Sequence, residues 1–417
     1  MKILIVNKFL HHVGGVETYI DWLAHNLENA GHELHFFGMS PPPGSQVLDS
    51  IAGRATFTPN RDFSGHGAHA AISAASSVYS RTVARKLEKV VGEFKPEMVH
   101  FHMTCRQLTP SVGHVVRVNR IPSVTTAHEY KFVCASQRLW NDHDQTRCTA
   151  CLHQTTLKRV SNILVRQCVR GSIVPSAIAA VELPISDKVW RRSGTVIHAP
   201  SQFMASTLRA SPWIAGPIEY LDLSWGSEVP RNAADGWENT VAYTGRLSRE
   251  KGVDTLLKAW KLVQGRIPNA RLRIAGSGNA AGELQMLASE LALRNVEFLG
   301  RYEPSELRQI LDGAAVTVHP SRWDENSPYT VRESLQHGVP AIVSNRGGLP
   351  EMVSPDTGTV FAAEDVGGLA AAIESELTAD RAGSREFRQA VARRIVSDVD
   401  HLDGLHGIYD LALLQRP

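Results

Sequence analysis

Short apolar runs alternate with amphipathic segments along the N-terminal half of the chain, and this alternation constrains the fold more than any other feature. Strands are predicted at residues 2–7, 33–37, 98–102 and 123–126. Helices are predicted at residues 16–29 and 73–91. Strands of this length that are separated by helices favour a parallel sheet with right-handed crossovers.

The C-terminal half has the same architecture without repeating the sequence. Strands are predicted at residues 240–244, 271–275, 296–299, 316–319 and 341–344, and helices at residues 253–264, 281–292, 304–312 and 328–337. A polar stretch with Gly and Pro at residues 226–239 is typical of an interdomain linker. We therefore predict an α/β protein of two Rossmann-like, doubly wound domains, 1–225 and 238–395, that face a central cleft.

The overall composition narrows the function classes. With 417 residues the chain can form two or three domains, and a formal net charge of +2 does not suggest a nucleic-acid-binding protein. No apolar run approaches 18 residues, so no membrane span is expected. The first residues fit a buried strand better than a signal peptide. We therefore expect a cytoplasmic protein, in which cysteines are thiols or metal ligands rather than disulfides.

Two carboxylates stand out in the segment that runs from Pro320 to Ser334. Glu325 is expected on the loop after a strand, and Glu333 about two turns into the helix that follows. In an open α/β sheet this crevice at the carboxyl end of a strand binds nucleotides, and a helix N-terminus offers free N–H groups to an anion. Glu333 could accept hydrogen bonds from two ribose hydroxyls. The alternative is an exposed pair of acids without a ligand.

Two cations lie in the segment Gly245-Arg246-Leu247-Ser248-Arg249-Glu250-Lys251-Gly252, which follows a predicted strand and opens a helix. Arg246 and Lys251 beside a helix N-terminus suit a pyrophosphate. Their alternative role is ordinary surface charge. Two glycine pairs occur in similar strand-to-helix positions, Gly14-Gly15 and Gly347-Gly348.

Taken together, these segments resemble the retaining glycosyltransferases of family 4, which have the GT-B fold. The resemblance runs from Lys2 to about Val353. The commonest loop of that family reads Glu-Gly-Phe-Gly, whereas this chain has Glu325-Asn326-Ser327-Pro328. That loop is similar to the Glu-Asn-x-Pro loop of a bacterial subgroup, which also has a cysteine-containing insertion after the stretch that corresponds to His128-Glu129-Tyr130.

The resemblance implies roles for the residues of the C-terminal half. Arg246 and Lys251 would hold the diphosphate of a nucleotide sugar and stabilise the leaving group, without a divalent metal ion. Glu333 would hold the ribose hydroxyls. Glu325, with the N–H groups of Asn326 and Ser327, would hold the sugar ring. The base would lie against the backbone near Arg301 and Tyr302.

The resemblance also implies roles in the N-terminal half. Gly14 and Gly15 would let the backbone approach the phosphates, and His128 would touch the transferred sugar. The last helix, 396–417, would cross back to this domain. Glu17 could belong to the site or could be a first-turn acid that favours the helix dipole. His128 could instead be a hydrogen-bonded core histidine.

Four cysteines cluster in the insertion, at Cys134, Cys148, Cys151 and Cys168. Four thiolates suit a tetrahedral, structural zinc ion, and Cys148-Thr149-Ala150-Cys151 has the spacing of a zinc knuckle. The spacing of the outer cysteines is loose, so reduced, partly buried thiols are the alternative.

Basic residues are in local excess in two places. Residues 145–181 contain Arg147, Lys158, Arg159, Arg166 and Arg170, and residues 81–89 contain Arg81, Arg85, Lys86 and Lys89. Such segments attract anionic lipid headgroups or a lipid-diphosphate acceptor, which predicts peripheral contact with the inner face of the plasma membrane. Solvated helix faces are the alternative.

The resemblance implies a retaining hexosyltransferase. It would move a sugar from a UDP- or GDP-sugar to a hydroxyl of a glycan or lipid-linked acceptor, in bacterial cell-surface or exopolysaccharide synthesis, without a required cofactor. The alternative is a catalytically inactive GT-B subunit that binds a nucleotide sugar as the partner of an active transferase.

Overall fold

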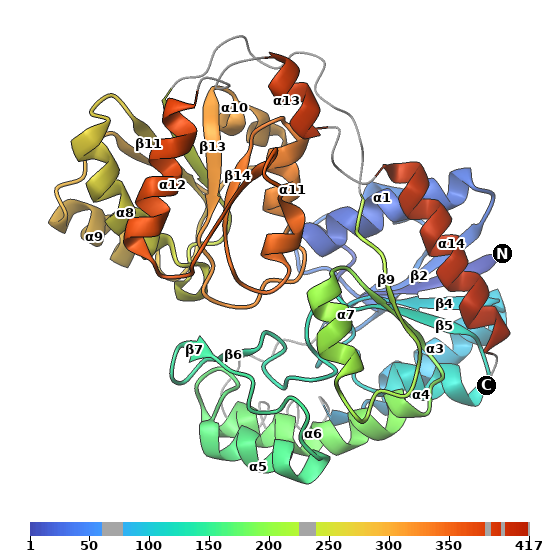
Figure 1. Ribbon diagram of the computed structural model, residues 1–417. Helices are drawn as coiled ribbons and strands as arrows, with labels where there is room; N and C mark the ends of the chain where they lie inside the picture. Colours follow the sequence, from blue (N-terminus) through green and yellow to red (C-terminus); the bar gives the residue numbers. More distant parts are fainter. Residues whose placement is uncertain (61–77, 225–238, 380–384, 393–396, 416–417) are drawn as a thin grey trace. The chain divides into compact units, whose positions relative to one another are not determined.

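The computed structural model describes residues 1–60, 78–224, 239–379, 385–392 and 397–415 (Figure 1). The chain divides into two compact units. The first consists of Met1–Asp144, Cys148–Gly226 and Ser397–Pro417, and the second of Gln145–Arg147 and Ser227–Val396. The predicted linker lies outside the described residues except for Asn239.

A seven-stranded parallel sheet forms the centre of the first unit, in the order β3-β2-β1-β4-β5-β8-β9. Its strands are β1 (Lys2–Val6), β2 (Glu33–Met39), β3 (Ala55–Thr58), β4 (Met98–Phe101), β5 (Ser123–Thr126), β8 (Val196–Ala199) and β9 (Ile218–Tyr220). The strand order reverses between β1 and β4. Such a switch point is where open α/β sheets bind ligands.

Helices cover both faces of this sheet (Figure 1). They are α1 (Gly15–Asn29), α3 (Arg81–Phe94), α4 (Ser111–Val118), α5 (Thr156–Arg166), α6 (Ile173–Arg191), α7 (Gln202–Arg209) and α14 (Asp398–Leu414). Two short strands, β6 (Trp140–Asn141) and β7 (Thr146–Arg147), lie between β5 and α5 along the chain. Among the helices of the described residues, none is both long and apolar enough to cross a membrane.

The second unit contains a six-stranded parallel sheet in the order β12-β11-β10-β13-β14-β15. Its strands are β10 (Thr240–Thr244), β11 (Arg271–Ala275), β12 (Val296–Gly300), β13 (Ala314–His319), β14 (Ala341–Ser344) and β15 (Gly358–Phe361). Its helices are α8 (Val253–Arg266), α9 (Ala281–Glu290), α10 (Leu307–Leu311), α11 (Tyr329–Gln336), α12 (Val366–Thr378) and α13 (Arg385–Ala392). Here the order reverses between β10 and β13.

The predicted α/β class with two parallel sheets is confirmed. Every strand predicted from an apolar run forms within two residues of its expected bounds. Four sheet strands escaped prediction: the short edge strands β3, β9 and β15, which contain few apolar residues, and the buried strand β8. The helix expected at residues 73–91 begins as α3 at Arg81, and its first five expected residues lie outside the described part of the chain.

A chain of hydrogen bonds docks α14 on the sheet of the first unit. The hydroxyl of Tyr409 lies 2.9 Å from Nδ1 of His100, and Nε2 of that ring lies 2.7 Å from Oγ1 of Thr126. Oγ1 of Thr126 lies 3.0 Å from Nδ1 of His198, whose Nε2 lies 2.7 Å from the carbonyl oxygen of Leu221.

Neutral rings satisfy this chain. The carbonyl of Leu221 can only accept, so Nε2 of His198 carries its proton and Nδ1 accepts from Thr126. Thr126 then accepts from His100, which accepts from Tyr409. Burial lowers the pKa of His198 to about 4 and lowers that of His100 well below its usual range. Protonation would place a positive charge in the core, which burial opposes.

We expect His198 to make the folding free energy depend on pH. Between about pH 6.5 and pH 4 the unfolded histidine binds a proton and the folded one does not, so its contribution to stability is present above pH 6.5 and is lost as pH falls. The slope is at most about 1.4 kcal/mol per pH unit. Urea unfolding at several pH values from 7.5 to 5 would measure it.

The comparison for that measurement is His198→Gln, which retains an amide donor and acceptor but does not titrate. The raised pKa of buried Glu17 acts in the opposite sense, so the informative quantity is the difference in slope between wild type and variant. Equal slopes would contradict a neutral His198 in the folded state.

Candidate functional site

The predicted donor motifs flank the switch point of the second unit. β10 leads directly into Gly245, and β13 leads into Pro320 and the loop that carries Glu325. The two strands are neighbours in the sheet and run parallel, so both loops leave it at the same edge. The motif residues, which are about 75 positions apart in sequence, therefore meet where a ligand is expected.

Lys251 and Glu325 form the central ion pair of this site. Nζ of Lys251 lies 2.6 Å from Oε1 of Glu325, and the hydroxyl of Ser321 donates to the same oxygen at 2.6 Å. Burial alone would raise the pKa of Glu325, but the ammonium of Lys251 and these hydrogen bonds hold it below its usual value. Glu325 is therefore an anion in the resting site, and Lys251 is fixed by it.

Close backbone contacts hold the two loops in place. A Cβ on Gly252 would lie 2.1 Å from the carbonyl oxygen of Pro320, and one on Gly347 would lie 2.0 Å from that of Glu325. Both glycines have positive φ, at 68° and 59°, a conformation that other residues rarely adopt. The N–H of Gly348 donates to the carbonyl of Glu325 at 2.8 Å. The pair Gly347-Gly348 thus shapes the Glu325 loop.

Glu333 lies in the second turn of α11, which begins at Tyr329, rather than two turns into it. Burial raises the pKa of its carboxyl to about 7. In the described part of the chain, no side-chain hydrogen bond or ion pair to this carboxylate occurs. The nearby Tyr302 has a raised pKa, mainly through burial and in part through the charge of Glu333. A half-buried acid without a cation beside it is ready to accept hydroxyl donors.

The remaining predicted residues of this unit are more exposed or otherwise engaged. The side chain of Arg246 is 62% exposed, and its guanidinium lies 3.7 Å from Glu250; it does not line the pocket formed around Lys251 and Glu325. Arg301 is exposed beside Glu303. The hydroxyl of Ser327 is bonded to Arg332, and Asn326 directly follows Glu325.

His319 belongs to the same pocket and escaped the sequence analysis. It is the last residue of β13, and its ring nitrogens lie 3.1 Å from Oγ1 of Thr317 and 3.4 Å from Oγ1 of Thr330. Burial lowers its pKa to about 3, and the charge of Lys251 contributes. The position of His319 as a polar residue at the end of an apolar strand could have identified it from the sequence.

In the first unit, the residues at the start of α1 form an open N-terminus. Gly14 is exposed, and no atom lies within 4 Å of the Cβ position that it lacks. Glu17 accepts from the N–H of Gly14 at 3.0 Å and from the side chain of Asn7 at 3.1 Å. Its carboxylate therefore caps the helix, as the alternative interpretation expected, whereas the phosphate contacts of Gly14 and Gly15 stay a prediction.

His128 follows β5 at the carboxyl edge of the same sheet. Its Nε2 lies 3.0 Å from Nδ1 of His102, and burial lowers its pKa to about 3. The rings of His100 and His102 lie 4.3 Å apart on one face of the sheet. His128 is thus a neutral, hydrogen-bonded histidine in this structure, and its contact with a sugar stays a prediction.

A charged cluster at this edge escaped the sequence analysis. The thiol of Cys105 lies 2.7 Å from Oε1 of Glu129 and 3.7 Å from Nζ of Lys8. Nζ of Lys131 donates to Oγ1 of Thr104 at 2.6 Å. These residues lie on the loops that follow the neighbouring strands β1, β4 and β5. Their separation in sequence hid a cluster that the parallel sheet brings together.

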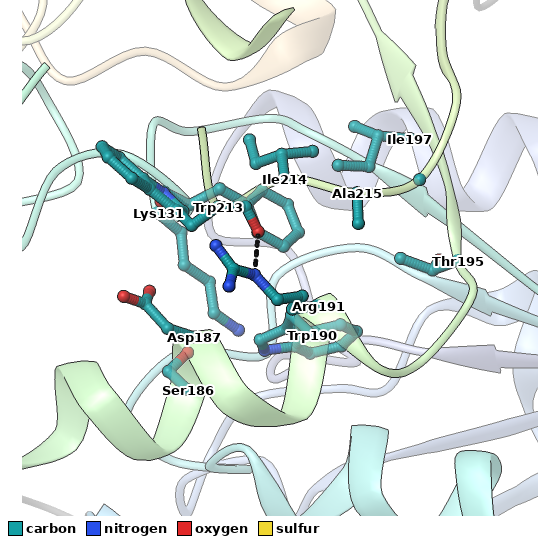
Figure 2. Close-up of a pocket in the computed structure, with 12 residues that line it drawn as sticks. Lys131, Ser186, Asp187, Trp190, Arg191, Thr195, Ile197, Trp213, Ile214 and Ala215 are labelled. Carbon is teal, nitrogen blue, oxygen red and sulfur yellow. Dashed lines mark hydrogen bonds between the residues drawn. The ribbon is translucent and has the colours of Figure 1, made fainter. Parts of the chain in front are cut away.

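A small pocket between α6 and β8 contains none of the predicted site residues. Figure 2 shows the side chain of Arg191 below Trp213, where its Nε donates to the carbonyl oxygen of Trp213 at 3.2 Å. Nζ of Lys131 lies 4.8 Å from the centroid of the Trp190 ring. The contact of Lys131 with Trp190 joins the loop after β5 to α6.

The four insertion cysteines line one small pocket, as free thiols. Burial raises the pKa values of Cys151 and Cys168 to about 12, and the neighbouring sulfurs contribute. Among the residues that the structure describes, however, no group of three or more His, Cys, Asp or Glu is arranged to hold a metal ion. The cysteines are gathered as predicted, and zinc binding stays a prediction.

Comparison with known proteins identifies the two halves. The model described as "Glycosyltransferase Family 4" matches residues 13–219, and the model described as "Glycosyl transferases group 1" matches residues 227–394. A solved sucrose-phosphate synthase from Thermosynechococcus elongatus superposes with a TM-score of 0.66 at 18% identity, over 98% of each chain. Anabaena Alr3699/HepE in complex with UDP has a TM-score of 0.68 at 15% identity, over 99% of this chain and 100% of its own. These likenesses show the fold.

Closer relatives are found by sequence. A glycogen synthase of Mycobacterium tuberculosis is 36% identical over 162 residues, 38% of this chain; the match spans only 39% of that relative's length. The GDP-mannose-dependent monoacylated alpha-(1-6)-phosphatidylinositol monomannoside mannosyltransferase of Corynebacterium glutamicum is 36% identical over 268 residues, 59% of this chain and 69% of the relative. The match covers more than two thirds of this relative, and a family model matches each half of the chain. The chain therefore belongs to the glycosyltransferases of family 4, with a group 1 glycosyl transferase region in its C-terminal half.

Proposed function

We propose that the chain is a retaining glycosyltransferase that moves a hexosyl group from a UDP- or GDP-sugar to a hydroxyl of a glycan or lipid-linked acceptor. The observation that carries this proposal is the Lys251–Glu325 pair at the switch point of the second unit, followed along the chain by the half-buried Glu333 of α11. These three residues match the three parts of a nucleotide sugar: Lys251 the diphosphate, Glu325 the sugar and Glu333 the ribose hydroxyls.

Each part has a proposed task. Lys251, held by Glu325, balances the diphosphate charge as the bond to the sugar breaks. The exposed Arg246 side chain is free to turn toward the same phosphates when they bind. Glu333 binds the ribose, and Glu325 with the N–H groups of Asn326 and Ser327 binds the sugar hydroxyls. Backbone near Arg301 and Tyr302 holds the base, and no divalent metal is required.

The chemical step is a front-face transfer. The bond between the anomeric carbon and the phosphate oxygen breaks, and the bond to the acceptor oxygen forms on the same face of the sugar. The acceptor proton passes to the departing phosphate oxygen. The roles proposed for the first unit are backbone contacts of Gly14 and Gly15 with the phosphates and a contact of His128 with the transferred sugar.

The setting that we propose is bacterial cell-surface or exopolysaccharide synthesis in the cytoplasm, at the inner face of the plasma membrane. The relatives' names support both donor classes, because one relative is GDP-mannose-dependent and one solved neighbour contains UDP. Binding of individual nucleotides therefore decides the donor.

We expect calorimetry with UDP, GDP, ADP and CMP to show selective binding of one nucleotide, and Glu333→Ala to weaken it by about 10- to 100-fold, because two hydroxyls lose their acceptor. The matched control is Glu290→Ala, which removes an exposed acid of α9. Lack of binding by folded wild type would sink the transferase proposal. Binding without turnover of any donor would favour the partner-subunit alternative.

The affinity for that nucleotide should depend on pH through Glu333. Its carboxyl has a pKa of about 7 in the empty site, and only the ionised form can accept from both ribose hydroxyls. Binding should therefore be full above pH 8 and weaken up to about tenfold per unit below pH 7. Dissociation constants measured from pH 5.5 to 8.5 test this. A Glu333→Gln variant should show a flat profile, and an equally flat wild-type profile would contradict the assignment.

The zinc prediction is tested by metal analysis of the purified chain. Four thiols around one pocket should hold about one zinc ion per chain, and Cys148→Ser with Cys151→Ser should release it and lower the melting temperature. The same double substitution leaves Cys105, which lies outside the insertion, as an internal control for thiol reactivity. Two results together would establish the reduced-thiol alternative. The wild-type protein would contain no metal after growth with zinc, and a chelator would leave its stability unchanged.

A further inference from the structure

Exposed apolar side chains are concentrated on the helical hairpin formed by α5 and α6. Of the fifteen large apolar residues exposed in the described part of the chain, six lie between residues 157 and 181. They are Leu157, Leu164, Val165, Ile173, Val174 and Val181, with Leu157 83% and Val165 79% exposed. The other nine are spread over both units. Clustered exposure of this kind marks an interaction surface.

Contacts at one end and in the middle hold the hairpin as an antiparallel pair. The hydroxyl of Thr156 and a guanidinium nitrogen of Arg159 both donate to Oδ2 of Asp187, at 2.9 Å and 2.7 Å. The start of α5 is therefore fixed to the end of α6. Ile163 and Ala180 belong to one buried apolar cluster between the helices. Figure 1 shows the two helices side by side.

The exposed stripes of the two helices face the same side of this pair. In an α-helix each residue is rotated by about 100° from the one before it. Ile163 of α5 and Ala180 of α6 are buried where the two helices meet. Leu164 and Val181 are the next residues along each chain, so each side chain is rotated by the same angle from that buried position. In two antiparallel helices, equal rotations of the same sense lead to one common face. Leu157 and Val174, each seven residues earlier, lie on the same stripes.

The charges on the hairpin have one sign. Between Thr155 and Arg192, a range that the structure describes completely, the exposed charged side chains are Lys158, Arg166, Arg170, Lys188, Arg191 and Arg192. The acids of this range, Glu182 and Asp187, are half-buried, and Asp187 is paired with Arg159. An apolar stripe bordered by basic residues alone is typical of a surface that lies in the headgroup region of an anionic bilayer.

We propose that the α5–α6 hairpin is a docking surface for an anionic phospholipid membrane. The apolar side chains enter the acyl boundary, and the basic ones contact lipid phosphates. The charges favour lipid over a second copy of the chain, because two such faces would bring like charges together.

The hairpin is also coupled to the acceptor edge, and this extension depends on the proposed function. Glu182 of α6 interacts electrostatically with Lys131 and Glu129, which belong to the charged cluster behind β5. A hairpin seated on the membrane therefore holds the acceptor edge of the first unit close to lipid headgroups. Such an arrangement suits a lipid-linked acceptor.

Co-sedimentation of the full chain with phosphatidylcholine vesicles, with and without phosphatidylglycerol, tests the proposal. We expect binding only with the anionic lipid, weakened by salt. The combined substitutions Leu157→Gln, Val174→Gln and Val181→Gln should reduce the partition coefficient at least tenfold. Lys158→Gln, Lys188→Gln and Arg192→Gln should reduce it about 100-fold. Leu262→Gln with Met286→Gln, two exposed residues of the second unit, should leave it unchanged.

The proposal is overturned if wild type stays in the supernatant, or if either hairpin variant binds like wild type while circular dichroism shows it folded. It is also overturned if sedimentation velocity shows a dimer that the apolar variant dissociates, since a second copy would then cover the face. Nucleotide binding is measured separately. Vesicle binding by a chain that binds no nucleotide would sink the transferase proposal and leave the docking surface intact.

Discussion

The close approach of backbone at two glycines is the constraint on which the candidate donor site depends. Gly252 lies against the carbonyl of Pro320, and Gly347 lies against the carbonyl of Glu325. These contacts bring the loops after β10 and β13 together, so that Lys251 and Glu325 meet with little freedom of movement. A charge pair that is oriented before the ligand arrives loses little energy to reorganisation during the reaction. In the described part of the chain, Glu325 has the ammonium of Lys251 as its partner, whereas Glu333 has no cation beside it.

A different constraint governs the first unit. Its sheet contains a row of buried histidines whose pKa values burial lowers, and two tyrosines form hydrogen bonds between the C-terminal helix and the rest of this unit. Tyr409 bonds to His100, and Tyr19 bonds to His401 of α14 at 2.9 Å. The last helix is therefore part of the core of this unit, although 382 positions separate Tyr19 from His401. His102 and His128 continue the row to the carboxyl edge, where a substrate is expected. Burial that makes the row neutral thus also determines the proton state of a candidate sugar contact.

The cysteine-bearing insertion combines two roles in one segment. Its thiols and apolar residues pack against each other inside the hairpin, while its outer faces carry exposed apolar and basic side chains. The two half-buried acids of the hairpin interact within the unit. Asp187 joins α5 to α6, and Glu182 interacts with the charged cluster. An added hairpin of this kind can change where a transferase works and which acceptor it meets, and it leaves the donor site untouched. It is consistent with a family in which the fold is shared and the acceptors differ.

The sequence by itself determined the class of fold, because alternating strand and helix periods are local properties. It also determined the motif chemistry, since Lys251, Glu325, Glu333 and the paired glycines stand next to predicted strands. The tertiary structure alone decided which cation is paired with Glu325, that Arg246 is exposed, and that Glu17 caps its own helix. It also revealed His319, the histidine row and the cluster around Cys105. The physical reason is that parallel strands bring together the ends of segments that are far apart in sequence, and that burial, which sets the pKa of each group, exists only once those segments are packed.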